Sequence, residues 1–128
     1  MGTKIVVVVA CMVLASCAAH GSQNREITNE SKYGVSYCLS LSYSDSGFAS
    51  DAKYVAGAYL QNGEFGVDMY EAIRGFVENY RKTPYLSKHG RNLDIMKCLD
   101  LFGSEELGHL IEEIANKSIQ PTAGASAD

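Results

Sequence analysis

The chain has 128 residues, of which 46% are hydrophobic and 9% aromatic, and its formal net charge at pH 7 is −4. This size and composition suit one globular domain and exclude a disordered or repeat protein. The acidic balance argues against nucleic acid as a partner, because phosphate binding needs a basic surface.

The first residues have the pattern of a secretory signal. Residues 1–4 carry one positive charge, residues 5–14 form an apolar run, and small side chains follow. A run of this length extends about 15 Å as a helix, half the thickness of a bilayer core, so a lasting transmembrane span is not expected. We therefore predict that residues 1–16 are a signal peptide and that the protein leaves the cytoplasm.

The sequence is compatible with two ways of cleaving this signal peptide. The sequence Leu-Ala-Ser-Cys at residues 14–17 resembles the bacterial lipobox, in which the Cys becomes the lipidated first residue of the mature chain. In that case Cys17 anchors an outer-membrane lipoprotein, and residues 17–30 form a polar linker between anchor and domain. The alternative is ordinary cleavage nearby, because residues 16–19 also offer small side chains at suitable spacing.

The rest of the chain predicts an all-α fold, a compact bundle of four to five short helices over residues 31–118. The first helix, residues 31–44, also alternates as a strand would, but nothing later in the chain supplies strand partners. The second helix ends near Gly63, which we expect to be a left-handed cap. Its apolar stripe consists of Phe48, Ala52, Val55, Ala56 and Tyr59.

The last three helices have capping and breaking residues at their ends. Asp68 and Glu71 can form a capping box in the third helix, and residues 83–84, Thr-Pro, end it. We expect Asn92 to cap the fourth helix and Ser104 the fifth. The expected inner faces are Tyr70, Ile73, Val77 and Tyr80, then Ile95, Cys98, Leu99 and Phe102, then Leu107, Leu110, Ile111 and Ile114.

The C-terminal residues 119–128 offer nothing to bury, so we predict a disordered tail.

Two cysteines remain in the predicted domain, Cys38 and Cys98. In an oxidising compartment, two cysteines with apolar neighbours predict one disulfide. On the chain-entropy model, closing the loop between these cysteines would stabilise the folded state by about 4 kcal/mol. The alternative is a Cys nucleophile. His89 is its one available base, because His20 lies in the linker and His109 on an exposed helix face.

The chain carries no motif for catalysis, for a cofactor or for a metal. It lacks HExxH, GxSxG, a phosphate-binding loop and CxxC. A lone His89 in a connector is more often solvated than ligating. We therefore expect a binding protein with no catalytic residues, no metal site and no cofactor.

The connector between the third and fourth helices concentrates positive charge in this acidic chain. It contains no acidic residue between Asn79 and Leu93. A connector needs only turn residues, so this charge is either incidental or serves to enter a partner. Its basic residues are Arg81, Lys82, Lys88 and Arg91, with His89 among them.

Four segments, in this order and spacing, carry a family resemblance: YGVSYCLSLSY, DAKYVAGAYLQNG, YEAIRGFVENY and YLSKHGRNLDIMKCLDLFGSEEL. Together they resemble the type VI secretion amidase immunity proteins of the fourth effector family, across residues 33–110. Two of the pieces are short, Ser-Lys-x-Gly at residues 87–90 and Met-Lys-Cys-x-Asp-Leu at residues 96–101, and the order and spacing of the pieces make the set specific.

The resemblance implies a small, helical, periplasmic protein that forms homodimers and is not an enzyme. Such a protein binds and blocks a peptidoglycan amidase that rival cells inject and that cuts the stem peptide with a Cys and a His. A loop of the family protrudes into the catalytic cleft of this toxin, and the matching stretch here is residues 87–90.

We expect this loop to fill a peptide-binding groove with hydrogen-bond donors without offering a scissile bond. Tyr85 is the expected aromatic anchor, and Gly90 permits a close backbone approach. The predicted toxin-binding residues are Tyr85, Ser87, Lys88, His89, Gly90 and Arg91.

Three other functions remain open. One is an exported helical lipoprotein that binds another envelope component. Another is an immunity protein against a different wall-degrading toxin. The third is a hydrolase that uses Cys98, which requires free thiols.

Overall fold

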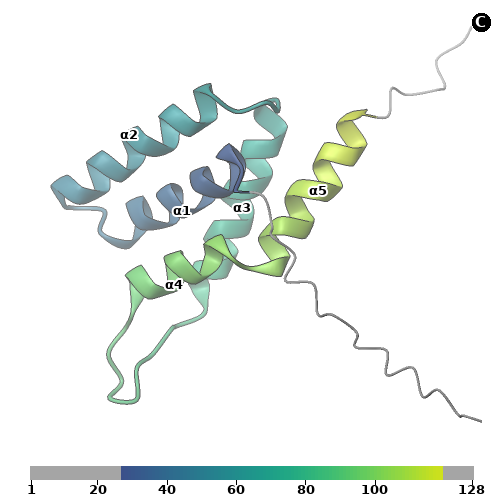
Figure 1. Ribbon diagram of the computed structural model, residues 1–128. Coiled ribbons are helices and arrows are strands. Elements are labelled where there is room, and N and C mark those ends of the chain that lie inside the picture. The colour runs from purple at the N-terminus through teal and green to yellow at the C-terminus, as the bar shows by residue number, and fades with distance from the viewer. Residues whose placement is uncertain (1–26, 120–128) are drawn as a thin grey trace, which may run out of the picture.

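The computed structural model describes residues 27–119, and this part of the chain folds into five helices (Figure 1). They are α1 (Asn29–Ser42), α2 (Gly47–Gln61), α3 (Val67–Lys82), α4 (Asp94–Phe102) and α5 (Glu105–Ile119). The described residues contain no strand, although an isolated antiparallel bridge pairs Leu86 with Asn92. The predicted all-α bundle is confirmed, as is a helix rather than a strand at its start.

Three predictions concern residues outside this range: the signal peptide at residues 1–16, lipidation of Cys17, and the tail at residues 119–128 apart from its first residue. Residue 119 itself ends α5. Over residues 27–119, no helix is both long enough and apolar enough to cross a membrane. The predicted linker is shorter than expected at its inner end, because α1 already begins at Asn29. Thr28 caps this helix by accepting a 3.2 Å hydrogen bond from the N–H of Ser31.

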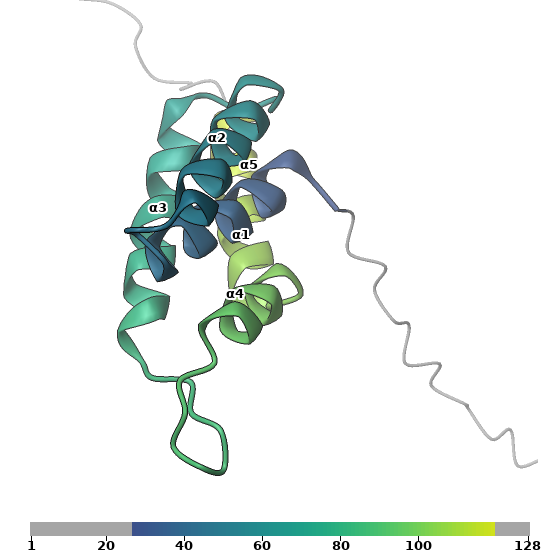
Figure 2. The same cartoon turned by 90° about the vertical axis from the view of Figure 1, so that its left-hand side faces the viewer.

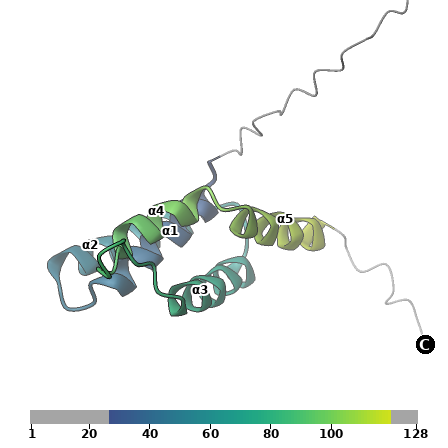
Figure 3. The ribbon, with the colours of Figure 1, turned by 90° about the horizontal axis from the view of Figure 1, so that it is seen from below.

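Helix α1 is central, because it packs against α2, α3, α4 and α5. The view from below shows α4 lying over it (Figure 3). Small buried residues make this packing possible: Ser36 and Ser40 are buried, and a Cβ added at Gly34 would stand 3.3 Å from Ile73 of α3. These residues lower the intrinsic helix propensity of α1, and close packing offsets that loss.

The predicted inner faces of α3 and α5 are confirmed. Tyr70, Ile73 and Val77 of α3 are buried, as are Leu107 and Ile111 of α5, while Tyr80, Leu110 and Ile114 pack against them. Both helices are long enough for their apolar spacing to define one face.

The predicted stripe of α2 is only partly correct. Ala52 and Ala56 are buried, and Tyr59 packs against the core. Phe48 and Val55 are instead 49% and 37% exposed. Helix α2 packs chiefly on α1, so its buried face is narrower than its apolar stripe.

The predicted inner face of α4 is wrong at two positions. Ile95 and Leu99 are 48% and 57% exposed, whereas Lys97, Cys98 and Leu101 are buried. The disulfide at Cys98 and the contacts of Lys97 described below fix the rotation of this nine-residue helix.

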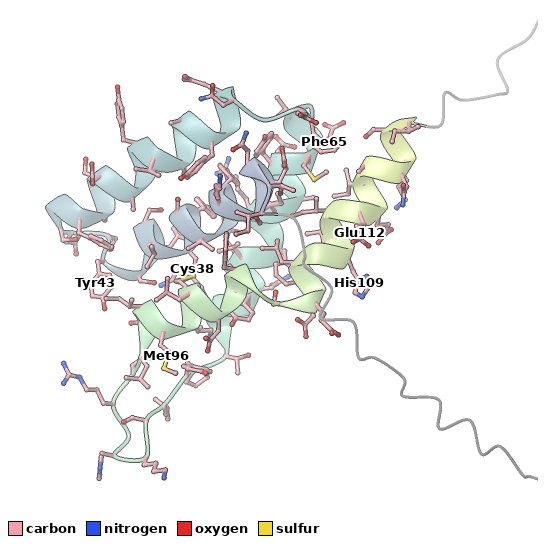
Figure 4. All side chains as sticks on the ribbon, viewed as in Figure 1. Cys38, Tyr43, Phe65, Met96, His109 and Glu112 are labelled. Atoms are coloured by element: carbon pink, nitrogen blue, oxygen red, sulfur yellow. A yellow bond between two sulfur atoms is a disulfide. The ribbon has the colours of Figure 1, made fainter. Side chains whose placement is uncertain are left out.

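The predicted disulfide is confirmed. The sulfur atoms of Cys38 and Cys98 are 2.04 Å apart and the Cα atoms 5.6 Å apart. Figure 4 shows Cys38 of α1 directed at α4. Both residues are almost completely buried, so this bond covalently joins the central helix to the shortest one.

Two predicted helix N-caps are wrong. Gly66 is the N-cap of α3, without a side-chain hydrogen bond, so the capping box of Asp68 and Glu71 does not start this helix. Leu93 precedes α4, and Asn92 instead donates from Nδ2 to Asp94 Oδ1 at 2.8 Å.

Two other predicted helix boundaries are confirmed. Thr83 ends α3, and Ser104 Oγ accepts a 3.2 Å hydrogen bond from the N–H of Leu107 in α5.

Gly63 is not the left-handed cap that we expected, since among the described glycines Gly90 has the positive φ. Gly63 lies against the side chain of Tyr70, and a Cβ there would overlap the Tyr70 hydroxyl. Glycine is therefore required at this position by packing and not by backbone conformation.

Candidate functional site

The connector between α3 and α4 forms a hairpin, residues 85–93, which we call the arm. It projects beyond the helices in two perpendicular views (Figures 1 and 2). The N–H of Leu93 donates to the carbonyl of Tyr85 at 2.9 Å, and the N–H of Ser87 donates to the carbonyl of Arg91 at 2.8 Å. With the bridge described above, these bonds pair the two legs of the arm along their length.

The end of the arm, residues 87–91, is a tight turn that we call the tip. The N–H of Gly90 donates to the carbonyl of Ser87 at 2.9 Å, and Gly90 has φ +75°. A turn followed by a left-handed residue is a common way to close a three-residue hairpin loop, and glycine adopts this φ without steric strain. Gly90 thus has a conformational role in the tip.

The side chain of Ser87 also shapes the tip. Its Oγ accepts hydrogen bonds from the N–H groups of His89, at 3.3 Å, and Arg91, at 3.1 Å. Serine commonly closes turns through such bonds to the following backbone. Ser87 and Gly90 therefore determine the shape of the tip, and the side chains of the other tip residues do not.

Lys88, His89 and Arg91 are the exposed side chains of the tip. Figure 4 shows nitrogen-tipped side chains at this end of the molecule. Within residues 27–119, these three side chains have no hydrogen-bonding or ion-pairing partner. The tip is therefore a locally positive, unpaired feature on an acidic protein.

Helix α4 holds the first leg of the arm through a side-chain hydrogen bond. The hydroxyl of Tyr85 donates to Asp100 Oδ2 at 2.6 Å. This hydrogen bond and the negative charge of Asp100 raise the pKa of Tyr85. Tyr85 is partly buried, whereas Lys88, His89 and Arg91 of the tip are exposed.

Lys97 holds the point where the arm leaves α3. Its Nζ donates to the carbonyl of Thr83, the C-cap of α3, and lies 5.1 Å from the ring centroid of Tyr80. Burial lowers the pKa of Lys97, and the nearby charge of Arg81 acts in the same direction. A helix C-terminus and an aromatic face both favour a cation, which accounts for a lysine that is only 5% exposed.

Sequence reasoning missed the roles of Lys97 and Asp100. Both belong to the Met-Lys-Cys-x-Asp-Leu segment at residues 96–101, which carried part of the family resemblance. In the structure this segment supplies the Thr83 contact, the disulfide and the Tyr85 contact in turn.

The remaining basic residues of the connector do not join the tip. Arg81 donates from Nη2 to the carbonyl of Leu41 in α1 at 2.9 Å, and Lys82 donates from Nζ to Asn79 Oδ1 at 2.8 Å. The basic cluster seen in the sequence thus separates into a pair of residues bound to helices and the exposed tip.

Nucleophilic catalysis by Cys98 is excluded, because its sulfur is bonded to Cys38. The hydrolase alternative, which required a free thiol there, is therefore wrong. A search of residues 27–119 finds no group of three or more His, Cys, Asp or Glu residues that could hold a metal ion.

A groove of about 430 Å³ lies between the start of α1 and the turn from α4 to α5. Its walls are mainly apolar, from Ile27, Phe102, Leu107 and Ile111, with Glu112 among the lining residues. It lies at the end of α4 opposite to the arm and contains no pair of groups suited to acid–base chemistry. The arm is the better candidate site.

Comparison with known proteins relates the described helices and the arm to one family. The family model for "Type VI secretion system (T6SS), amidase immunity protein" matches residues 28–111. Among solved structures, a chain of the effector–immunity system Tae4/Tai4 from Salmonella typhimurium matches with 31% identity and a TM-score of 0.60. The match covers 66% of this chain and 83% of that one. No curated protein matches.

Proposed function

Because this chain belongs to the family of type VI secretion system amidase immunity proteins, we propose that it blocks an amidase toxin by inserting the tip of the arm into the catalytic cleft. Family membership makes the chain an immunity protein and not an enzyme, with an amidase toxin as its partner. The proposal adds the part of the surface that does the blocking.

The preformed tip is the observation that carries this proposal. Its backbone is closed by hydrogen bonds within the tip: the N–H groups of His89 and Arg91 donate to Ser87 Oγ, and the N–H of Gly90 donates to the carbonyl of Ser87. A convex element that is already ordered loses little conformational entropy when it enters a concave site. Insertion therefore suits this hairpin better than it suits a helix face.

The charge of the tip also fits an amidase cleft. A groove that holds the amines of a peptidoglycan stem peptide offers hydrogen-bond acceptors to its substrate. Lys88 and Arg91 can donate to the same acceptors, and bonds from charged donors are stronger than neutral ones. His89 lies between them at the end of the tip and is exposed.

We propose that the block takes place in the periplasm, where peptidoglycan is accessible. The disulfide between Cys38 and Cys98 supports this location, because such bonds persist in oxidising compartments.

We also propose that the protein forms a homodimer. Three exposed apolar side chains lie at i, i+1 and i+4 on α4, Ile95 at 48%, Met96 at 50% and Leu99 at 57%, and they support an association surface on this helix. Light scattering on the purified protein would measure the oligomeric state.

For the N-terminus, we propose a membrane anchor through lipidated Cys17. Mass spectrometry of the mature chain would separate lipidation from ordinary cleavage nearby.

The test of the main proposal is inhibition of a fourth-family amidase from the same genome by the purified mature protein. Peptidoglycan hydrolysis is followed against inhibitor concentration, and we expect a block at near-equal stoichiometry. A triple variant, Lys88→Ala with His89→Ala and Arg91→Ala, keeps Ser87 and Gly90 and hence the turn. We expect it to lose inhibition by at least about tenfold.

The control for this variant is Lys53→Ala, which removes an exposed lysine of α2 and should leave inhibition unchanged. Replacing Ser-Lys-His-Gly by Gly-Ser-Gly-Ser at residues 87–90 removes both the turn and the charge, so it should abolish inhibition. Full inhibition by both tip variants would contradict cleft insertion. No inhibition by the unaltered protein would point to a different wall-degrading toxin or another envelope partner.

A further inference from the structure

We propose that Asp100 and Lys97 are positioning residues that hold the arm ready for the amidase. In this assignment Tyr85 supports the arm through Asp100 and is not a toxin contact. The inference rests on the function proposed above and changes the role that the sequence suggested for Tyr85.

Tyr85 is bound to the structure on two sides. Its hydroxyl donates to Asp100 in α4, and its carbonyl accepts a hydrogen bond from the N–H of Leu93 on the opposite leg. A hydrogen bond to a carboxylate is stronger than one between neutral groups. The phenol is therefore engaged within the protein, and the exposed tip begins two residues later.

Lys97 fixes the chain just before the arm begins. Its ammonium binds the carbonyl of Thr83, where the chain leaves α3, and its own carbonyl accepts a 3.1 Å hydrogen bond from the hydroxyl of Tyr80. The base of the arm is thus held at Thr83, two residues before the first leg, and again at Tyr85. Both contacts come from one helix.

Cys98 lies between the two positioning residues on α4. Its disulfide to Cys38 ties this helix to the central helix α1. The direction in which the arm projects is therefore set by the bundle, through α4, and not by the arm alone.

The expected consequence concerns preorganisation. If the base contacts are removed, the arm samples other directions and only a fraction of molecules presents the tip correctly. The apparent dissociation constant then rises in inverse proportion to that fraction. Because the tip itself is unchanged, the loss should fall mainly on the association rate.

The test measures binding kinetics between the mature protein and a catalytically inactive fourth-family amidase. We expect Tyr85→Phe and Asp100→Ala each to slow association by about three- to tenfold, and the double variant to be no worse than either one. Asp100→Asn keeps an acceptor for the hydroxyl and should restore most of the rate.

A direct toxin contact by Tyr85 predicts a different set of results. Asp100→Ala would then leave binding unchanged, and Tyr85→Ala would speed dissociation far more than Tyr85→Phe does. That outcome would overturn the positioning role.

A second measurement needs no toxin. Trypsin can cut after Lys88 and Arg91, so the rate of cleavage in the arm reports how well the arm is held. We expect cleavage to be faster by at least about threefold in Tyr85→Phe and in Asp100→Ala, at an unchanged melting temperature. Lys97→Met should also speed cleavage. Because Lys97 is buried, this substitution can also lower the stability of the fold, so its result is compared with those of the Asp100 variants.

The two measurements separate the positioning role from the proposed function. If the unaltered protein binds no amidase, the function fails and the cleavage assay alone decides the positioning role. If the protein binds and the variants match it in both assays, the positioning role is wrong and the function stands.

Discussion

The hydroxyl of Tyr70 in α3 donates a 3.0 Å hydrogen bond to Glu30 Oε1 in the first turn of α1. Both residues are buried, with exposed fractions of 2% and 3%. The N-terminal end of a helix favours a negative charge, and the phenol supplies Glu30 with a hydrogen-bond donor. This contact joins the central helix to α3, next to the place where Gly63 packs against the Tyr70 side chain.

Gly63→Ala should destabilise the protein by about 2–4 kcal/mol, because the new Cβ would overlap the Tyr70 hydroxyl and separate it from Glu30. Denaturant unfolding measures the loss. The matched control is Gly57→Ala in α2, where a Cβ meets nothing within 4 Å. Alanine is the better helix former, so the control should gain about 0.5–1 kcal/mol. Equal effects of the two substitutions would contradict the packing role of Gly63.

Stability should fall at alkaline pH, with Tyr70 as a main cause. Burial, together with the hydrogen bond to Glu30, raises the pKa of Tyr70 from 10.0 to about 12. Below pH 10 the phenol is neutral in both the folded and unfolded states. Between pH 10 and 12 the unfolded chain loses this proton first, so the free energy of unfolding falls by up to about 3 kcal/mol.

An ultraviolet absorbance titration of the folded protein would detect this late-ionising phenol. Tyr70→Phe should remove it and flatten the alkaline fall in the free energy of unfolding. A titration curve that is the same with and without Tyr70 would show that the residue does not control this pH range.

Replacing Cys38 and Cys98 by Ala should lower the free energy of unfolding by about 4 kcal/mol, since the bond closes a sequence separation of 60 residues. Reduction of the unaltered protein should give a similar loss, measured by denaturant unfolding. Because Cys98 also fixes α4, the arm should become more sensitive to trypsin in the same samples. A reductant that changes neither stability nor cleavage would contradict this role.

Arg81→Met should cost about 1–2 kcal/mol of stability, because the carbonyl of Leu41 loses its charged donor. Amidase binding should not change, since Arg81 faces α1 and not the tip. Lys82→Met is the neighbouring control and should change stability by less than about 0.5 kcal/mol, because Lys82 is exposed and bonds only to Asn79. If the folded Arg81→Met variant binds the toxin more weakly, the prediction is wrong and Arg81 belongs to the binding surface.

The sequence predicted the inner faces of α3 and α5 better than those of α2 and α4. Helices α3 and α5 have 16 and 15 residues, and their apolar spacing defines one face. Helix α2 is as long, but it packs chiefly on α1, so part of its apolar stripe stays exposed. Helix α4 has nine residues and is apolar on several sides, so periodicity could not give its rotation. Tertiary contacts of Cys98 and Lys97 decide that rotation, and Ile95 and Leu99 remain exposed as a result.

The same division applies to the site. The turn at the tip follows from local chemistry, since a Ser and a Gly at fixed spacing are turn residues. The base contacts join residues 14 and 15 positions apart, Lys97 with Thr83 and Asp100 with Tyr85. The sequence does not indicate which residue a lysine or an aspartate on a helix will contact, so these two contacts could be found only in the folded structure.

The tip separates the residues that make its shape from those that face outward. Ser87 and Gly90 close the turn, whereas the side chains of Lys88, His89 and Arg91 have no partner among residues 27–119. Substitutions at the outward positions should therefore leave the fold and its stability almost unchanged. If the tip binds the toxin as proposed, a population that meets a new toxin variant can therefore alter recognition through single codon changes at these positions, without changing the helical scaffold.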